Sequence, residues 1–162
     1  MHLNNLLRAS IIFLIGFLIA NFINFYFVYG LENPLFKNFG FSDSKEAPFD
    51  FIKEDQIEVY PDKVIIKIKN PSIGRYAPTG SMVPTFNENS NGIRIKPRSE
   101  KDIHVGDIIT FRQDGSLIVH RVIDIGTDKD GTYFITRGDS NSLDDGKIRF
   151  KDIQYVMVGI IW

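Results

Sequence analysis

Three short stretches of the sequence contain residue types that together could perform nucleophilic catalysis. In residues 79–86 a small-residue turn presents Ser81, residues 117–123 contain His120, and residues 136–146 are rich in aspartate. A serine hydroxyl becomes an effective nucleophile when a neighbouring base removes its proton and an acid orients that base. The order serine, histidine, aspartate along the chain therefore makes a serine nucleophile our first hypothesis.

The context of Ser81 supports this hypothesis only in combination with the other two stretches. Gly80 permits a tight turn, in which backbone N–H groups can stabilise an oxyanion. Alone, a Gly-Ser pair shortly before Pro84 is more often an ordinary turn. Met82 is either the wall of a shallow apolar pocket for small side chains or a core residue, and both alternatives stay open. Gly80 and Met82 are our candidate substrate-binding residues.

The candidate bases are the three histidines of the chain. His2 precedes an uncharged segment and falls on the opposite side of an expected membrane, whereas His104 lies in a turn that leads into an expected strand. His120 lies on the apolar face of an expected strand, where a histidine is usually structural unless a serine and a carboxylate converge on it. A lysine base is the other known solution, but residues 115–126 contain no lysine.

Three aspartates, Asp139, Asp144 and Asp145, are candidates for the orienting acid. An isolated segment of this composition is most simply a solvated turn. A calcium-binding loop is excluded, because its pattern would require Asp or Asn at Leu143 and glycine at Asp144. The remaining hypothesis is that one of these carboxylates holds the tautomer of His120 and stabilises its protonated form.

The elements that must position these residues begin with an uncharged segment, residues 9–31. As a helix it would span about 34 Å at ~1.5 Å per residue, enough to cross a bilayer. The alternative is a cleavable signal peptide, with Arg8 as its basic region and residues 11–20 as its apolar core, but no small-x-small cleavage site follows. We therefore expect a transmembrane helix over residues 9–31.

The charge pattern predicts the orientation of that helix. Arg8 lies directly before the uncharged segment, and acidic residues outnumber lysines in the segment that follows it. Because positive charges favour the cytoplasmic side, residues 1–8 are expected to be cytoplasmic and the rest of the chain extracytoplasmic. The expected location is the cell membrane, or the endoplasmic reticulum with the domain in its lumen if the source is eukaryotic.

Beyond the helix, the sequence predicts a linker and one β domain. Residues 32–55 contain proline, glycine and scattered apolar residues, as is typical of a linker. From residue 56 to residue 162, short alternating runs are separated by turn signals such as Pro61-Asp62-Lys63 and Asp114-Gly115. The resulting prediction is a mainly β, barrel-like domain.

Composition excludes several classes of function. The net charge of −1 over 162 residues gives no electrostatic footprint for nucleic acid. The chain contains no cysteine, which excludes disulfides, thiolate metal sites and cysteine nucleophiles.

Four ordered stretches resemble sequence boxes of type I signal peptidases. The stretches are residues 79–85, which resemble the Ser-Gly-Ser-Met-x-Pro-Thr box; residues 105–109, which resemble the Gly-Asp-Ile strand box; residues 119–122, which resemble the His-Arg-Val box; and residues 136–141, which resemble the Thr-Lys-Gly-Asp-Asn-Asn box. The histidine box is similar to that of the archaeal and endoplasmic-reticulum branch, since bacterial enzymes have lysine there. The chain departs from the pattern at Thr79, where serine is usual, at Ser140, where asparagine is usual, and in a polar insertion-like loop over residues 87–104.

This resemblance implies roles for the candidate residues. Ser81 would be the nucleophile, His120 the general base, and Asp145 with Asp139 the supporting acids, with no metal or organic cofactor. We expect Asp145 to accept the N–H of His120, Asp139 to organise its loop through hydrogen bonds from backbone N–H groups, and Asp144 to be solvated.

The same resemblance implies a fold and an activity. The fold would be a barrel-like signal-peptidase catalytic domain behind one N-terminal transmembrane helix. The activity would be that of a membrane-bound serine endopeptidase that removes signal peptides from exported preproteins at the lipid bilayer, with partner subunits left open. Two alternatives remain: a protease of narrower substrate range, and a membrane-tethered, non-catalytic β module that binds signal segments or a partner subunit.

Overall fold

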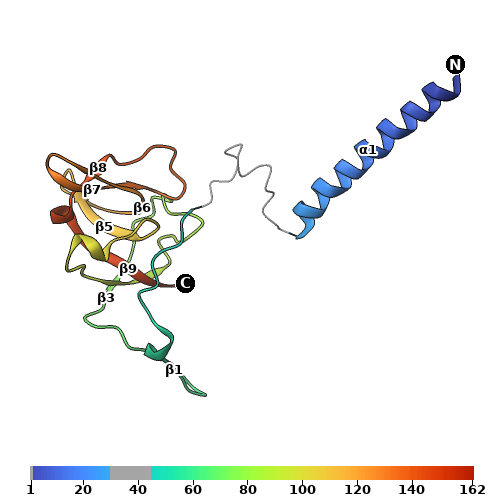
Figure 1. Ribbon diagram of the computed structural model, residues 1–162. Coiled ribbons are helices and arrows are strands. Elements are labelled where there is room, and N and C mark those ends of the chain that lie inside the picture. Colours follow the sequence, from blue (N-terminus) through green and yellow to red (C-terminus); the bar gives the residue numbers. More distant parts are fainter. Residues whose placement is uncertain (1, 30–44) are drawn as a thin grey trace. The chain divides into compact units, whose positions relative to one another are not determined.

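A computed structural model describes residues 2–29 and 45–162 of the chain. The chain divides between residues 44 and 45 into two compact units (Figure 1). The first contains a single described helix, and the second contains all of the described strands.

The helix α1 extends over His2–Tyr29. The large apolar side chains that the structure describes in this helix, including Ile12, Phe13 and Leu18, are exposed. The Asn21 side-chain amide donates a 2.8 Å hydrogen bond to the Phe17 carbonyl one turn earlier. The expectation of a helix is therefore confirmed as far as Tyr29.

The membrane-spanning assignment of this segment is not supported by the structure. Within the described residues, no helix combines the length and the apolar character needed to cross a membrane. The last two residues of the predicted span, 30 and 31, lie outside the described residues.

A short hairpin begins the second unit. Strands β1 (Ile57–Val59) and β2 (Val64–Ile66) pair antiparallel, with Val59 opposite Val64. The expected turn at Pro61-Asp62-Lys63 is confirmed, because it lies between these two strands.

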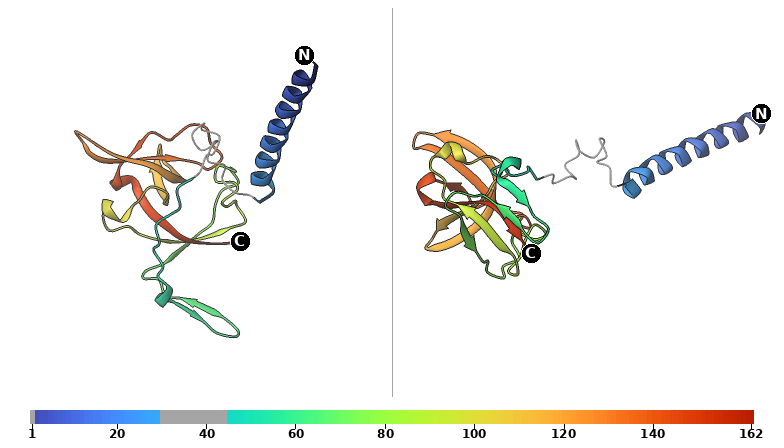
Figure 2. Two further views of the ribbon diagram at one scale, coloured as in Figure 1. Left: turned by 45° about the vertical axis from the view of Figure 1, so that its right-hand side comes forward. Right: turned by 90° about the horizontal axis from the view of Figure 1, so that it is seen from below.

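The main sheet has seven antiparallel strands in the order β3-β4-β9-β5-β6-β7-β8. The strands are β3 (Ser72–Gly74), β4 (Asn91–Ile95), β5 (Ile108–Gln113), β6 (Ser116–Asp128), β7 (Gly131–Arg137), β8 (Lys147–Ile148) and β9 (Ile153–Ile161). Register shifts in the β4–β9, β5–β9 and β6–β7 pairs bend the sheet, whose strands curve around the core (Figure 2).

The mainly β class is confirmed, and in residues 45–162 the strands form one open seven-stranded sheet and one two-stranded sheet, without closure into a barrel. Within residues 45–162, the edge strand β3 pairs only with β4, and the edge strand β8 pairs only with β7. These edges are three and two residues long, respectively. Strands this short offer too few backbone groups to close the sheet, so it stays open.

The hairpin between β5 and β6 follows from its local sequence. Gln113 lies opposite Ser116, which leaves Asp114 and Gly115 as a two-residue turn. Both turn residues have positive φ, 49° and 79° respectively. This is the geometry that favours Asp-Gly between twisted antiparallel strands, and the predicted turn is confirmed.

Two apolar clusters lie on opposite faces of the central strands, because successive side chains of a strand alternate. Ile109, Phe111 and Phe134 belong to the larger cluster and are fully buried. Ile108 belongs to a second cluster whose other buried members are Met82, Phe86 and Met157. This second cluster packs the turn containing Ser81 against the sheet.

Part of the expected linker packs on the β unit. The Phe49 N–H donates a 2.8 Å hydrogen bond to the Asp107 carboxylate, and Phe51 packs against the larger apolar cluster. The Ala47 carbonyl oxygen lies only 2.2 Å from the position that a Cβ of Gly106 would occupy. Gly106 therefore lets residues 45–51 pass directly over the turn before β5.

Three 3₁₀ turns complete the unit: η1 (Glu54–Gln56), η2 (Glu100–Asp102) and η3 (Phe150–Asp152). Residues 87–104, which we expected to be an insertion-like loop, contain both β4 and η2. Strand β4 pairs between β3 and β9, so this segment contributes a strand to the main sheet.

Candidate active site

The turn that presents Ser81 is held by its own backbone and by two buried anchors. Val83 N–H donates to the Gly80 carbonyl at 3.1 Å. Gly80 has φ +71°, a conformation that favours glycine. Met82 and Phe86 are only 3% and 5% exposed, so the chain directly after the serine is fastened to the second apolar cluster at two positions.

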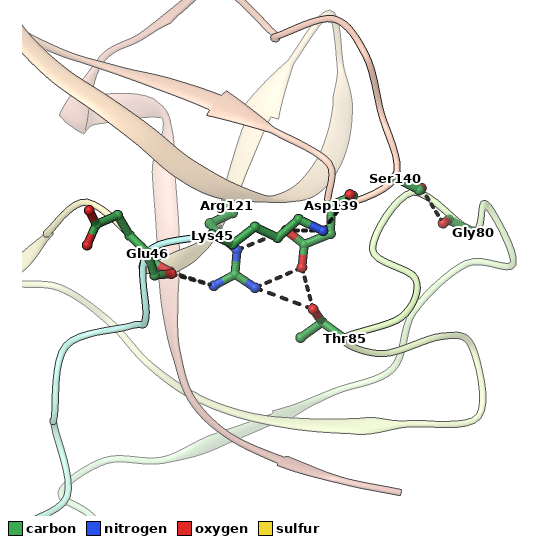
Figure 3. Close-up of polar contacts among 8 residues, drawn as sticks. Lys45, Glu46, Gly80, Thr85, Arg121, Asp139 and Ser140 are labelled. Atoms are coloured by element: carbon green, nitrogen blue, oxygen red, sulfur yellow. Dashed lines mark hydrogen bonds and ion pairs between the residues drawn. The ribbon is translucent and has the colours of Figure 1, made fainter. Parts of the chain in front are cut away.

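The aspartate-rich loop docks directly on this turn. Ser140 N–H donates to the Ser81 carbonyl at 3.0 Å, and Ser140 Oγ donates to the Gly80 carbonyl at 2.7 Å (Figure 3). A Cβ on Gly138 would lie 2.7 Å from the Ser81 carbonyl oxygen. The close approach of the two segments therefore requires glycine at position 138.

The hydroxyl of Ser81 lies beside a second hydroxyl. Thr79 Oγ1 is 3.2 Å from Ser81 Oγ and 3.4 Å from Ser81 N. Threonine thus provides the same chemical group at this position as the serine that is usual there. No sequence pattern apart from the family resemblance assigns Thr79 a function.

His120 and Asp145 are brought together as expected. The Nδ1 atom of His120 lies 2.7 Å from Asp145 Oδ2, and both side chains are largely buried, at 8% and 14% exposed. Thr136 Oγ1 donates to the same carboxylate oxygen at 2.7 Å. A carboxylate at Nδ1 favours the tautomer that carries its proton there and leaves Nε2 as a proton acceptor.

The backbone also holds Asp145 in place. Its N–H donates to the Thr136 carbonyl at 2.8 Å, and its own carbonyl accepts from Gln113 Nε2 at 3.0 Å. Thr136 is on β7 and Gln113 ends β5, so both elements position this acid beside β6. Sequence reasoning missed both of these polar partners, because each is an unremarkable residue of an alternating strand.

Ser81 and His120 line one cavity of about 390 Å³, and the candidate binding residues Gly80 and Met82 line it too. Met82 was predicted to be either a core residue or the wall of an apolar pocket. In the structure it is both, since it belongs to the second apolar cluster and lines the cavity. Between the described side chains of Ser81 and His120 the structure shows no direct hydrogen bond. Catalytic hydrogen bonds are often long without substrate and tighten when it binds.

Asp139 does not contact His120. Its carboxylate accepts two hydrogen bonds from Arg121, Nε to Oδ1 at 2.8 Å and Nη2 to Oδ2 at 2.7 Å, and a third from the Thr85 hydroxyl (Figure 3). The Asp139 side chain is 1% exposed. We expected this aspartate to accept from backbone N–H groups, which is wrong, because a buried guanidinium occupies both oxygens instead.

The electrostatics of Asp139 follow from these contacts. Burial acts to raise its pKa, but the hydrogen bonds from Arg121 and Thr85 and the charges of Arg121 and Lys45 outweigh burial and hold the pKa below its usual value. Asp139 is thus an ionised member of a buried pair. It links the turn after Ser81, through Thr85, to the strand that carries His120.

Arg121 extends this network to the segment before the sheet. Its Nη1 donates to the Gly106 carbonyl at 2.9 Å and to the Glu46 carbonyl at 3.3 Å (Figure 3). Lys45 Nζ donates to the Asp139 carbonyl at 2.7 Å. Sequence reasoning did not single out Arg121, although an arginine in an apolar strand requires an acidic partner and could have indicated one.

The other titratable candidates lie apart from this cavity. The His104 ring stacks on Phe49 at 4.2 Å between centroids, and its Nδ1 is 3.3 Å from Asp107 Oδ2. The side chain of His2 lies outside the described residues. Asp144 is exposed, as expected. Within residues 2–29 and 45–162, no group of three or more acidic, histidine or cysteine side chains is placed to ligate a metal.

Comparison with known proteins shows that part of the chain is similar in sequence to signal peptidases. Over 68 residues the chain is 40% identical to signal peptidase I W of Bacillus subtilis, a match that covers 41% of this chain and 36% of that protein. Over 70 residues it is 36% identical to the signal peptidase complex catalytic subunit sec11 of Dictyostelium discoideum, covering 41% of this chain and 38% of that protein. Over 90 residues it is 27% identical to the corresponding subunit SEC11 of Yarrowia lipolytica, covering 51% of each chain.

These matches confirm the resemblance of the chain to signal peptidases. The chain spans between about a third and a half of the length of these relatives. No protein-family model matches the chain, and no solved structure matches it significantly.

Proposed function

We propose that this chain is a membrane-bound serine endopeptidase that removes signal peptides from exported preproteins. The observation that carries the proposal is the cavity lined by both Ser81 and His120. Asp145 Oδ2 lies 2.7 Å from His120 Nδ1, which leaves Nε2 of the same ring as the proton acceptor. The names of the relatives support the same activity, since all three are signal peptidases or their catalytic subunits.

In the proposed reaction, Ser81 Oγ attacks the carbonyl carbon of the scissile peptide bond while His120 Nε2 accepts its proton. The imidazolium that forms is stabilised by Asp145. The same proton then passes to the leaving amine nitrogen, which leaves an acyl ester on Ser81. A water molecule, deprotonated by His120 in turn, hydrolyses the ester and restores the serine.

The negative charge of the tetrahedral intermediate requires donors beside Ser81. The Thr79 hydroxyl lies 3.2 Å from Ser81 Oγ, and the N–H of Ser81 donates to the same threonine oxygen at 3.4 Å. We assign the oxyanion to these groups. Asp139 has a different role in this proposal: with Arg121 it keeps the serine turn and the histidine strand in register, and it takes no part in proton transfer.

The proposed function also includes attachment of the chain to a membrane. Residues 9–31 carry no charge, and α1 is helical over most of this segment. On the absence of charge from residues 9–31 alone, and not on the apolar character of the described helix, we propose a single-pass anchor there, with a cytoplasmic N-terminus and residues 45–162 outside the cytoplasm. Two of the relatives are named as subunits of a complex, so partner subunits for this chain are part of the proposal.

Two experiments test these assignments. The purified full chain is incubated in detergent with a labelled preprotein, beside Ser81→Ala, and the new N-terminus of the product is sequenced. We expect one cut at the end of the signal peptide in the wild type and a loss on the order of 10⁴-fold in the variant. Binding of the preprotein without any cleavage would favour the non-catalytic β module instead.

The second experiment addresses the anchor. Membranes that contain the full chain are extracted at alkaline pH and then treated with protease from each side. The proposal expects the chain to stay in the membrane fraction and to be cleaved after residue 31 only from the outer side. Release of a soluble protein shortened near residue 30 would instead support a cleavable signal peptide.

A further inference from the structure

The cavity that contains Ser81 and His120 extends to a polar region that the proposed reaction does not use. Met82, Phe86 and Ile118 line its apolar part, which suits small apolar side chains. Tyr76 and Arg94 also line the cavity, and neither takes part in the contacts of His120, Asp145 or Asp139.

Both of these polar residues have buried atoms that lack a hydrogen-bond partner. The Tyr76 hydroxyl and Arg94 Nε are the two buried side-chain atoms of the described residues left without one. Burying a donor without an acceptor costs free energy, so an acceptor that reached either atom would be bound favourably. Burial also raises the pKa of Tyr76, against the smaller effect of the Arg94 charge, so the hydroxyl remains a donor.

The surrounding strands make room for these two side chains. A Cβ at Gly92 would lie 1.6 Å from the Tyr76 hydroxyl, and a Cβ at Gly74 would lie 2.9 Å from Arg94 Nη1. The Arg94 guanidinium stacks over the Tyr155 ring at 4.2 Å, which restricts its orientation. Arg94 on β4 and Tyr76, which follows β3, are therefore both held in fixed positions by their neighbours.

The charged side chains that line this part of the cavity, apart from His120, are all positive. Arg75 and Arg94 line the cavity, and the lining residues described by the structure include no carboxylate. In the described part of the chain, no acidic side chain forms an ion pair with Arg94; its contact is the tyrosine ring. A guanidinium with free donors favours a carboxylate, which it can bind with two parallel hydrogen bonds.

We propose that Arg94 and Tyr76 form a subsite that binds the carboxylate of an aspartate or glutamate of the substrate, close to the cleaved bond. This inference rests on the proposed function, because it places the acidic residue in the same cavity as Ser81. A cavity of about 390 Å³ holds the side chains of only a few residues, so the acid lies near the scissile bond in sequence.

The test separates binding from cleavage. Peptides with aspartate or asparagine at each position around the cleaved bond are titrated onto the Ser81→Ala protein by calorimetry. The full-length wild type is assayed with the same pairs. We expect one position at which the aspartate peptide binds about tenfold more tightly, the ratio expected from one hydrogen bond to a charged group, and at which kcat/KM rises in parallel.

Variants then locate the source of that preference. In the Ser81→Ala background, Arg94→Gln should abolish the aspartate preference, and Tyr76→Phe, which removes a single oxygen atom, should reduce it. Arg98→Gln removes the same charge from an exposed residue outside this cavity and should leave the preference intact. Thermal melting checks that each variant is folded.

Each result decides the proposal. Equal binding of every aspartate and asparagine pair to the Ser81→Ala protein overturns the subsite, as does a preference that persists in both Arg94→Gln and Tyr76→Phe. If the wild type cleaves no peptide, the proposed activity fails, and the binding preference still decides whether this carboxylate subsite exists.

Discussion

Replacing Asp145 by asparagine changes one atom in the proposed catalytic group. Asp145 Oδ2 accepts from both Thr136 Oγ1 and His120 Nδ1, each at 2.7 Å. An asparagine can place its oxygen there and lose the charge, or place its NH₂ there and force the opposite imidazole tautomer. In the first case the protonated His120 loses its counter-charge, and in the second Nε2 already carries a proton when the serine needs a base.

The structure sets the scale of the loss. Two unit charges 2.7 Å apart interact by about 6 kcal/mol at an effective dielectric constant of ~20. At 1.36 kcal/mol per factor of ten, this corresponds to a fall in kcat of about 10⁴-fold. The folded state loses a hydrogen bond to a charged group and keeps the size of the residue, so its free energy of unfolding should fall by only about 1–3 kcal/mol.

The assay is single-turnover cleavage of a preprotein by Asp145→Asn, beside thermal melting. Asp144→Asn is the matched control, because it makes the same chemical change at the exposed neighbouring position and should retain wild-type activity. If Asp145→Asn cleaves within about tenfold of the wild type, the orientation and stabilisation of His120 by this carboxylate would be refuted.

Two further predictions concern the framework around the site. Asp139→Asn leaves buried Arg121 without its charged partner, so denaturant unfolding should show a loss of about 3–5 kcal/mol, with activity falling as the serine turn loosens. Because the pKa of Asp139 is lowered on folding, its stabilising contribution is present above the ordinary carboxyl pKa and is lost as pH falls through the lower folded value. The acid-induced decrease in stability should therefore be shallower in Asp139→Asn, and an unchanged acid slope would contradict this. Gly138→Ala brings a Cβ to 2.7 Å from the Ser81 carbonyl and should lower both activity and melting temperature, whereas Gly159→Ala meets only Ile93 side-chain carbons at 3.6 Å or more and should be tolerated. Full activity of Gly138→Ala would show that the loop need not dock on the serine turn.

The features predicted correctly from the sequence are local ones. The turn at Asp114-Gly115 follows from two residues that accept positive φ, and the β1–β2 hairpin follows from a turn signal between two apolar runs. The pairing of His120 with Asp145 was also anticipated, because the family resemblance placed an acid at that position.

The features that were missed depend on long-range order. β9, at the end of the chain, inserts between β4 and β5, and no local pattern predicts that neighbour. The Arg121–Asp139 pair joins a strand to a loop 18 positions later, and Glu46 reaches Arg121 from 75 positions away in the chain. Whether the sheet closes was decided by the shortness of β3 and β8, and neither strand had been predicted.

In the proposed mechanism, His120 activates Ser81 for peptide-bond cleavage. The decisive measurement is the single-turnover cleavage rate of one preprotein with the wild type, Ser81→Ala, His120→Ala and His104→Ala, each checked for folding. We predict a loss on the order of 10⁴-fold in Ser81→Ala and His120→Ala, and a rate close to that of the wild type in His104→Ala, whose ring contacts Phe49 and Asp107 outside the cavity. An active Ser81→Ala, or an active His120→Ala beside an inactive but folded His104→Ala, would contradict the mechanism.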